Sequence, residues 1–219
     1  MQMEEFKLMN ENDGIPLFKP YIPKNTIEYV TDTLNSRWIG EGPKVKSFEN
    51  KFAKFVKAKE GCVAVNSGTA ALHLSYILSD IKKDDEVICP LFTCTATNLP
   101  ILYQGGIPIF CDINTNNLNL NVDEIESLIS EKTKAIIVVD YGGVPNEYEK
   151  LRGICDKYKL KLISDCAHCI DGKFKDKRIH EWSDFTIYSF QAIKTMTTGD
   201  GGMLICSRVE DTKLAKKIR

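Results

Sequence analysis

The chain has 219 residues, of which 43% are hydrophobic and 27% are charged, and its 29 Lys and Arg nearly balance its 30 Asp and Glu. This is the composition of an ordinary globular protein that can bury a core, and a net charge so near zero argues against binding nucleic acid through bulk positive charge. No apolar run reaches the about 18 residues of a membrane span, and the polar start lacks the apolar stretch of a secretory signal, so we expect a cytoplasmic protein with no membrane partner.

Short apolar runs, several of them continuous rather than alternating, predict strands that are covered on both faces of a sheet. In chain order these runs are 62–65, 87–89, 108–113, 135–141, 161–165, 185–190 and 203–206. Helical spacing or surface-helix composition marks 44–57, 69–79, 122–130, 146–159 and 209–219. The alternation of strands and helices favours an α/β fold with a mostly parallel sheet.

Three of these segments give more specific expectations. The apolar stripe of 44–57 consists of Val45, Phe48, Phe52, Phe55 and Val56, which predicts an amphipathic helix. The 69–79 helix is apolar almost all round, so we expect it to be buried. The amphipathic 209–219 segment ends the sequence without a Gly, a Pro or a cap, so we expect the chain to be cut short there.

The connection between the last two strands is too short for a parallel crossover. Only residues 191–202 separate them, and such a crossover needs about a dozen residues or more, usually with a helix. The segment is rich in Thr and Gly, which is loop composition. We therefore expect the last strand to run antiparallel to its neighbours or to lie elsewhere in the sheet.

The eight cysteines mostly lie inside apolar runs. Without a secretory signal, buried free thiols are the expected state. Cys166 and Cys169 form one C-x-x-C, a spacing that also occurs in redox and zinc motifs. Because no second C-x-x-C completes a zinc site, packing is the favoured interpretation and no metal site is expected.

Ligands bind at the carboxyl ends of strands in an open α/β sheet, so polar residues that follow strands are the candidates for a site. After the 62–65 strand, Asn66 or Ser67 can cap the next helix, and Gly68 allows close approach of the backbone. The free N–H groups and dipole of that helix favour an anion, and Thr69 adds a hydroxyl donor. Taken alone, the motif is better explained as an ordinary helix cap without a ligand, because such caps are common.

Two further strand ends carry reactive groups. Asp165 ends the 161–165 strand, where a buried carboxylate needs a partner such as a cationic ring nitrogen or an Arg, and His168 follows three residues later. Lys194 lies beyond the 185–190 strand, where a lysine can act as a nucleophilic amine, and Ser189 can add a hydroxyl to the anion site. A turn-capping Asp165 and a solvated Lys194 are the alternatives.

The three sites follow strands of one sheet, so they can converge on one pocket. An anion cradle, a buried carboxylate and a lysine amine suit the phosphate, the ring nitrogen and the aldehyde of pyridoxal 5'-phosphate (PLP). PLP draws electrons from a substrate carbon, which is the chemistry of transamination. The sequence therefore predicts a PLP-dependent enzyme.

Seven segments along the chain resemble the DegT/DnrJ/EryC1/StrS family of PLP-dependent sugar-nucleotide aminotransferases. They are IPLFKPYI, GEGPKVKSFENKFAKF, AVNSGTAALHL, DEVICPLFTCTATN, GGIPIFCDI, ISDCAHCIDG and SFQAIKTMTTGDGGML. The resemblance implies the three-layer large domain of fold type I, spanning residues 1–219, with one antiparallel strand in a mostly parallel central sheet. It also implies a homodimer, and the family's C-terminal small domain is expected to be absent from this chain.

The resemblance assigns roles by position. Lys194 binds the cofactor covalently and carries a proton, Asp165 pairs with the ring nitrogen, and His168 packs near the ring. The phosphate is held by Gly68, Thr69, Ala70 and Ser189. Cys94 takes the place of an aromatic residue that often stacks on the ring in this family, a contact that Phe92 could supply instead. Trp38 and the 40–44 turn lie where the family often lines the sugar pocket, although Trp38 is as well explained as a core residue.

Family members transfer an amino group from glutamate to a keto-sugar nucleotide, for surface polysaccharide, lipopolysaccharide or an antibiotic. Two alternatives stay open. The family also contains PLP-dependent sugar 3-dehydratases, which have a histidine in place of Lys194, and a truncated chain can be a non-catalytic remnant that keeps the PLP-binding fold. An NAD-dependent dehydrogenase is disfavoured because NSGTAA lacks the G-x-G-x-x-G pattern.

Overall fold

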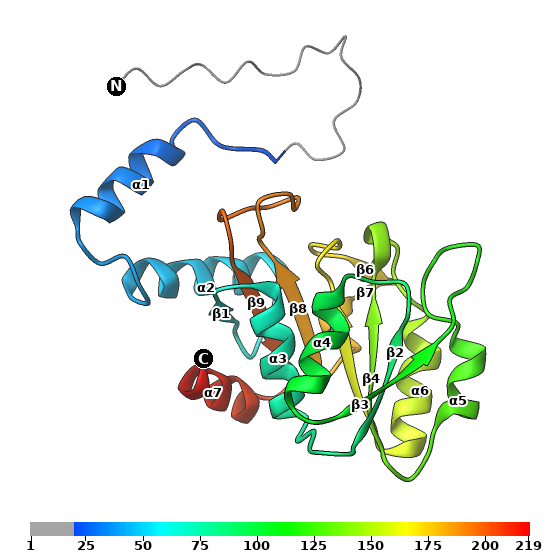
Figure 1. Cartoon of the computed structure of the whole chain (residues 1–219). Coiled ribbons are helices and arrows are strands. Elements are labelled where there is room, and N and C mark those ends of the chain that lie inside the picture. The colour runs from blue at the N-terminus through cyan, green and yellow to red at the C-terminus, as the bar shows by residue number, and fades with distance from the viewer. Residues whose placement is uncertain (1–19) are drawn as a thin grey trace.

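The structure is a computed structural model, and it describes residues 20–219. Its centre is a seven-stranded sheet with helices on both faces, as Figure 1 shows. The strand order is β1-β9-β8-β5-β4-β2-β3. The strands are β1 (Val63–Val65), β2 (Glu86–Pro90), β3 (Ile107–Cys111), β4 (Thr133–Val139), β5 (Lys161–Asp165), β8 (Phe185–Ser189) and β9 (Gly202–Cys206).

One strand of this sheet, β9, runs against all the others. It pairs antiparallel with both β1 and β8, and the remaining neighbours pair parallel. The chain reverses between β8 and β9 without a helix, in a loop that is closed by the Phe190 N–H donating to the Gly201 carbonyl over 2.9 Å. Gly199 and Gly201 have φ angles of +83° and +156°, which L side chains rarely adopt. The predicted antiparallel last strand is thereby confirmed.

Helices form a layer on each face of the sheet, as the α/β prediction requires. The first layer contains α2 (Pro43–Val56), α5 (Ile125–Leu128) and α6 (Tyr148–Tyr158), and the second contains α3 (Gly68–Leu78), α4 (Thr95–Tyr103) and α7 (Val209–Ile218). Ile136 and Ile137 are consecutive residues of β4 that belong to different core clusters. Because both faces of the strand are buried, the strand reads as a continuous apolar run.

Two helices were not predicted. The sequence of α4 includes Pro100 and is held by tertiary contacts: the Tyr76 hydroxyl donates to the Thr97 carbonyl over 2.8 Å, and the Asn98 amide to the Pro90 carbonyl over 2.9 Å. The other is α1 (Thr26–Asn35), which has no buried residue and lies apart from the sheet in Figure 1. Neither helix therefore shows what made α2 predictable, which is an apolar stripe at helical spacing that packs on the core.

Two details of the predicted helices were wrong. The 122–130 stretch is a 3₁₀ turn (Val122–Glu124) followed by the short α5, because Ile129 has an extended backbone. In α2, Phe52 and Val56 are buried as predicted, but Phe55 is 52% exposed. A small hairpin of β6 (Lys173–Phe174) and β7 (Lys177–Arg178) lies outside the main sheet. Among the described helices, none is long and apolar enough to cross a membrane.

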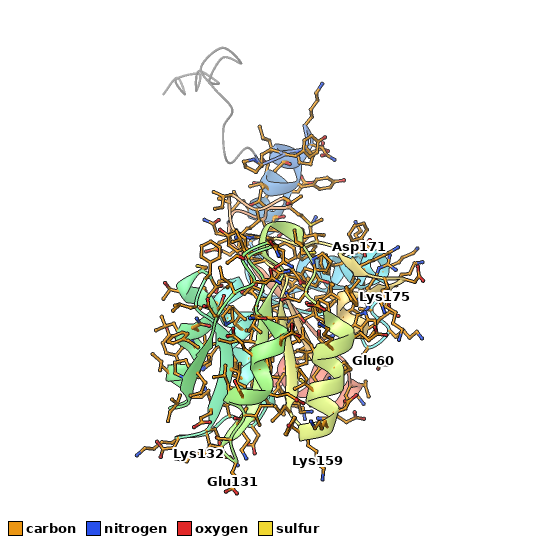
Figure 2. All side chains as sticks on the ribbon, turned by 90° about the vertical axis from the view of Figure 1, so that its right-hand side faces the viewer. Glu60, Glu131, Lys132, Lys159, Asp171 and Lys175 are labelled. Carbon is orange, nitrogen blue, oxygen red and sulfur yellow. The ribbon has the colours of Figure 1, made fainter. Side chains whose placement is uncertain are left out.

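The two ends of the sheet can be located in Figure 2. Glu131, Lys132 and Lys159 stand just before β4 and β5, and they project from the lower end of the molecule. Asp171 and Lys175 follow β5 and lie toward the opposite end. The carboxyl ends of the parallel strands, with the residues that follow them, therefore lie away from the Glu131 end. Most of segment 15–22, which contributed to the family resemblance, falls outside the described residues.

Gly202 is where β9 touches the start of α3. A Cβ atom at this position would lie 2.2 Å from the Ser67 carbonyl oxygen, so the backbone would have to move. We predict that Gly202→Ala lowers the free energy of unfolding in urea by about 1–3 kcal/mol, as overpacking does. The matched control is Gly153→Ala in α6, where a Cβ meets nothing within 4 Å and alanine favours the helix by up to about 1 kcal/mol. Equal stability of the two variants would contradict the close contact.

Candidate active site

The first turn of α3 is free to bind an anion. Ser67 is the N-cap, and its Oγ accepts a hydrogen bond from the Ala70 N–H over 3.1 Å. The N–H groups of Gly68 and Thr69 precede the first possible acceptor within the helix. With the positive end of the helix dipole, these groups can act as the anion cradle that the sequence predicts at this strand end, and the anion itself stays a prediction.

Ser189 lies against this cradle. It is the last residue of β8 and is 7% exposed. A Cβ atom on Gly68 would lie 3.0 Å from the Ser189 Cβ and 3.3 Å from its Oγ, so the absence of a side chain at Gly68 is what lets the two segments meet. A hydroxyl from β8 thus joins the N–H groups from α3, although the two residues are far apart in the sequence.

Asp165 is a buried carboxylate that has hydrogen bonds but no cationic partner. It ends β5 and is 4% exposed. Its Oδ2 accepts from the Thr97 hydroxyl over 2.8 Å, and its Oδ1 accepts from the Ala167 N–H over 3.0 Å. No ion pair within residues 20–219 includes it. A buried charge without a counter-ion is costly, so a bound cation would stabilise the ionised carboxylate.

The electrostatics of Asp165 reflect this position. Burial raises the pKa of the carboxyl above its ordinary value, and the hydrogen bonds from Thr97 and Ala167 oppose the rise. The positive charge of Lys194 opposes the rise as well, and His168 does so in its protonated form. A cation bound beside Asp165 would act in the same direction and favour the ionised carboxylate.

Lys194 and His168 line one cavity of about 230 Å³, together with Gly142, Ala167 and neighbours of Lys194. The turn that carries Lys194 is set by its N–H donating to the Gln191 carbonyl over 2.8 Å. Burial, followed by the charge of Lys194, holds the pKa of His168 below its usual value. Its Nδ1 accepts from the Gly142 N–H over 3.4 Å, so the neutral ring carries its proton on Nε2.

Three residues that contact Asp165 or His168 were not found from the sequence. Thr97 bonds Asp165 across 68 positions of the chain, and no local pattern marks it. Tyr141 follows β4 and lies edge-on to His168, with ring centroids 5.4 Å apart, and Gly142 approaches the same imidazole. Tyr141 and Gly142 come directly after β4 and Asp140. A search of the residues that follow β4, like the search made after the other strands, would have found them.

The structure links Cys94 to this group only through the backbone. Cys94 is the exposed N-cap of α4, and its carbonyl accepts from the Thr97 N–H over 2.9 Å. None of the side-chain hydrogen bonds within residues 20–219 joins Cys94 to Asp165, His168 or Lys194. The neighbouring Phe92 packs on Tyr141, with ring centroids 4.7 Å apart. A role of Cys94 beside a cofactor ring stays a prediction.

A larger pocket of about 780 Å³ lies next to the anion cradle. Gly40 and Glu41 line it together with Asn66 and Ala70, so the 40–44 turn lies near the first turn of α3. Trp38 is 59% exposed and is not a core residue. Its indole N–H donates to the Glu41 carbonyl over 2.7 Å, which orders this turn.

The C-x-x-C thiols point to separate acceptors. The Cys166 Sγ donates to Asp140 Oδ2 over 3.2 Å, and the Cys169 Sγ lies 3.6 Å from the Gly143 carbonyl oxygen. Burial raises the pKa of both thiols, that of Cys169 to about 12. Both side chains therefore serve the packing beneath the β4 and β5 strand ends, and seven of the eight cysteines are buried.

Comparison with known proteins gives one family. The model of the DegT/DnrJ/EryC1/StrS aminotransferase family matches residues 20–219. The chain is 38% identical to the spore coat polysaccharide biosynthesis protein SpsC of Bacillus subtilis, over 97% of this chain and 54% of SpsC. It is 35% identical to a GDP-perosamine synthase of Vibrio cholerae, over 87% of this chain and 52% of that enzyme. The chain thus spans about half the length of the curated relatives it matches.

Solved structures share the fold. The PLP form of Spr1654 from Streptococcus pneumoniae superposes with a TM-score of 0.87 at 32% identity, covering 93% of this chain and 56% of that one. The same protein has also been solved in its PMP form, with the same TM-score. The predicted α/β architecture, with a mostly parallel sheet and one antiparallel strand, is confirmed by these matches.

Proposed function

The chain belongs to the DegT/DnrJ/EryC1/StrS aminotransferase family, and from this we propose that it binds PLP and transfers an amino group from glutamate to a keto-sugar nucleotide. The product would be an amino-sugar nucleotide for polysaccharide or lipopolysaccharide synthesis. The observation that carries the proposal is the convergence of three strand ends. The cradle at Gly68, the buried Asp165 and the Lys194 cavity all lie at the carboxyl edge of one sheet.

The residues present fit PLP in charge and in hydrogen bonding. Its phosphate needs N–H and hydroxyl donors, which the first turn of α3 and Ser189 provide. Its ring nitrogen, when protonated, is the cation that Asp165 lacks. We assign the phosphate to Gly68, Thr69, Ala70 and Ser189. PLP, when bound, would supply an electron-withdrawing ring that stabilises negative charge at the substrate carbon.

The remaining roles belong to side chains of the Lys194 cavity. We assign the Lys194 amine to covalent attachment of the cofactor and to carrying a proton to and from the substrate carbon. His168 shares that cavity and is kept neutral by burial and by Lys194, so it would orient the ring without adding a second positive charge. Asp165, held by Thr97 and Ala167, would keep the ring nitrogen protonated.

The surroundings of the site suggest where the substrate and a partner lie. The pocket of about 780 Å³ between the 40–44 turn and Asn66 is the candidate place for the sugar nucleotide. We propose that residues 1–219 serve as a cofactor-binding large domain and that the protein works as a homodimer. The exposed apolar side chains of Ile27, Val30 and Leu34 on α1 form a surface that an assembly would cover. The many free thiols suit the reducing cytoplasm.

The half-reaction with the amino donor tests this proposal. Protein saturated with PLP is mixed with L-glutamate, and the 2-oxoglutarate released is compared with the amount of bound cofactor. We expect about one 2-oxoglutarate per bound PLP, because each cofactor accepts one amino group before a keto-sugar is supplied. Bound PLP without 2-oxoglutarate would favour the non-catalytic alternative. Failure to bind PLP at all would overturn the proposed function.

A further inference from the structure

Thr97 is a buried hydroxyl with a specific acceptor. It lies in the first half of α4 and is fully buried. Its Oγ1 is 2.8 Å from Asp165 Oδ2 and 2.7 Å from the Oγ1 of Thr93. Its backbone is fixed as well, because its carbonyl accepts from the Tyr76 hydroxyl over 2.8 Å. The position of this hydroxyl is therefore determined by two elements, α3 and α4.

The direction of the hydrogen bonds follows from the chemistry of a carboxylate. An ionised carboxylate only accepts, so Thr97 must donate its single proton to Asp165. Thr97 then has only lone pairs to offer to Thr93, which must be the donor in their contact. The two hydroxyls form an ordered chain, from the half-buried Thr93 through Thr97 to Asp165, with every proton directed toward the carboxylate.

A protonated Asp165 would disturb this order. If Oδ2 carried a proton, it would face the Thr97 proton, and both hydroxyls would have to turn. The second oxygen is held too, since Oδ1 accepts from the Ala167 N–H. The geometry thus favours one charge state and one orientation of the carboxylate. A hydrogen bond donated to the charged form of an acid stabilises that form and lowers the pKa of the acid.

We infer that Thr97 is a positioning residue, which holds Asp165 as an oriented and ionised acceptor for a cationic ring nitrogen. The inference rests on the proposed function in one respect, the identity of that cation. The coupling between Thr97 and Asp165 does not depend on it. Among the described residues, the titratable groups that interact electrostatically with Asp165 are Tyr76 of α3, Cys166, His168 and Lys194. Asp140, which follows β4, donates its backbone N–H to the Asp165 carbonyl over 3.2 Å.

The test measures Asp165 directly in the cofactor-free protein. Carbon-13 labelling of the aspartate carboxyls follows its titration by NMR, with the signal assigned by its loss in Asp165→Asn. We expect Thr97→Val to move the titration of Asp165 to higher pH and Thr97→Ser to restore the wild-type curve. In PLP binding we expect Thr97→Val to weaken affinity by at least about ten-fold, the size of a hydrogen bond to a charged group, and Thr97→Ser to recover it.

The control is Thr186→Val, another fully buried threonine, whose hydroxyl has no hydrogen-bond partner among the described residues. It is expected to leave both the titration and PLP affinity unchanged. If Thr97→Val fails to fold, Thr97→Cys replaces the hydroxyl by a weaker donor of similar size and is expected to shift the titration the same way. An unchanged Asp165 titration in folded Thr97 variants would overturn the inference, whereas wild-type protein that fails to bind PLP would overturn only the proposed function.

Discussion

Replacing Lys194 with alanine is expected to lower the rate of 2-oxoglutarate formation by at least about 10³-fold, within the range for loss of a proton-transferring group. Lys194 is the amine that lines the cavity shared with His168. The phosphate cradle at Gly68 and Ser189 is untouched by the change, so PLP should still bind without a covalent bond. The measurement is the initial rate with glutamate per bound cofactor, together with the absorption spectrum of the cofactor.

The matched control for this change is Lys132→Ala. Lys132 is exposed and projects from the opposite end of the molecule, as Figure 2 shows. This variant should keep the wild-type rate and spectrum, because it alters neither the cavity nor the fold. Equal rates for Lys194→Ala and Lys132→Ala would show that the amine of Lys194 has no part in the chemistry.

The second large effect is expected from Asp165→Asn. The amide is nearly the same size and its oxygen can still accept from Thr97, so the fold should survive. It carries no negative charge, however, and cannot keep a ring nitrogen protonated. We expect the rate with glutamate to fall by at least about 10²-fold, as when a preorganised electrostatic partner is removed. The rate is measured at saturating PLP, so that a lower rate reflects slower amino transfer and not weaker binding of the cofactor.

Asp140→Asn provides the comparison for that experiment. Asp140 is a neighbouring buried carboxylate whose oxygens accept from Asn146, Tyr148 and Cys166. Its loss should lower the free energy of unfolding by about 1–3 kcal/mol, because buried donors lose their acceptor. The rate per bound cofactor should change far less than in Asp165→Asn. If the two variants lose equal activity at equal stability, Asp165 has no special electrostatic role.

The sheet could be predicted because each strand carries its own signal. Lys161–Asp165 was predicted with its observed limits, since the apolar pair Leu162 and Ile163 lies between two charged residues there. The antiparallel direction of β9 followed from the length and Gly content of the connection before it. These are local properties, and burial on both faces of the sheet makes them strong.

The missed elements depend on contacts between distant parts of the chain. Helix α4 contains threonines and Pro100, which are poor helix formers, and it is held by contacts from Tyr76 and to Pro90. Helix α1 does have apolar residues at helical spacing, Ile27, Val30 and Leu34, and that pattern could have revealed it. None of its residues is buried, so no packed face confirms the pattern.

In the candidate site, too, residues with a local sequence signal were predicted and a residue defined by a distant contact was missed. Gly68, Asp165 and Lys194 were found because each follows a strand, and the topology of the sheet brings strand ends together. Thr97 was not found because its role exists only through a hydrogen bond that joins α4 to β5. Cys94 was assigned only through the family resemblance, and its place at the exposed N-cap of α4 leaves that role a prediction.

The proposed function depends on Lys194 being the amine that binds the cofactor, and one measurement tests this most directly. Protein saturated with PLP is reduced with borohydride, digested, and searched by mass spectrometry for the lysine that carries the pyridoxyl group. We predict stoichiometric label on the peptide that contains Lys194. Label spread over exposed lysines, with Lys194 unmodified, would contradict it.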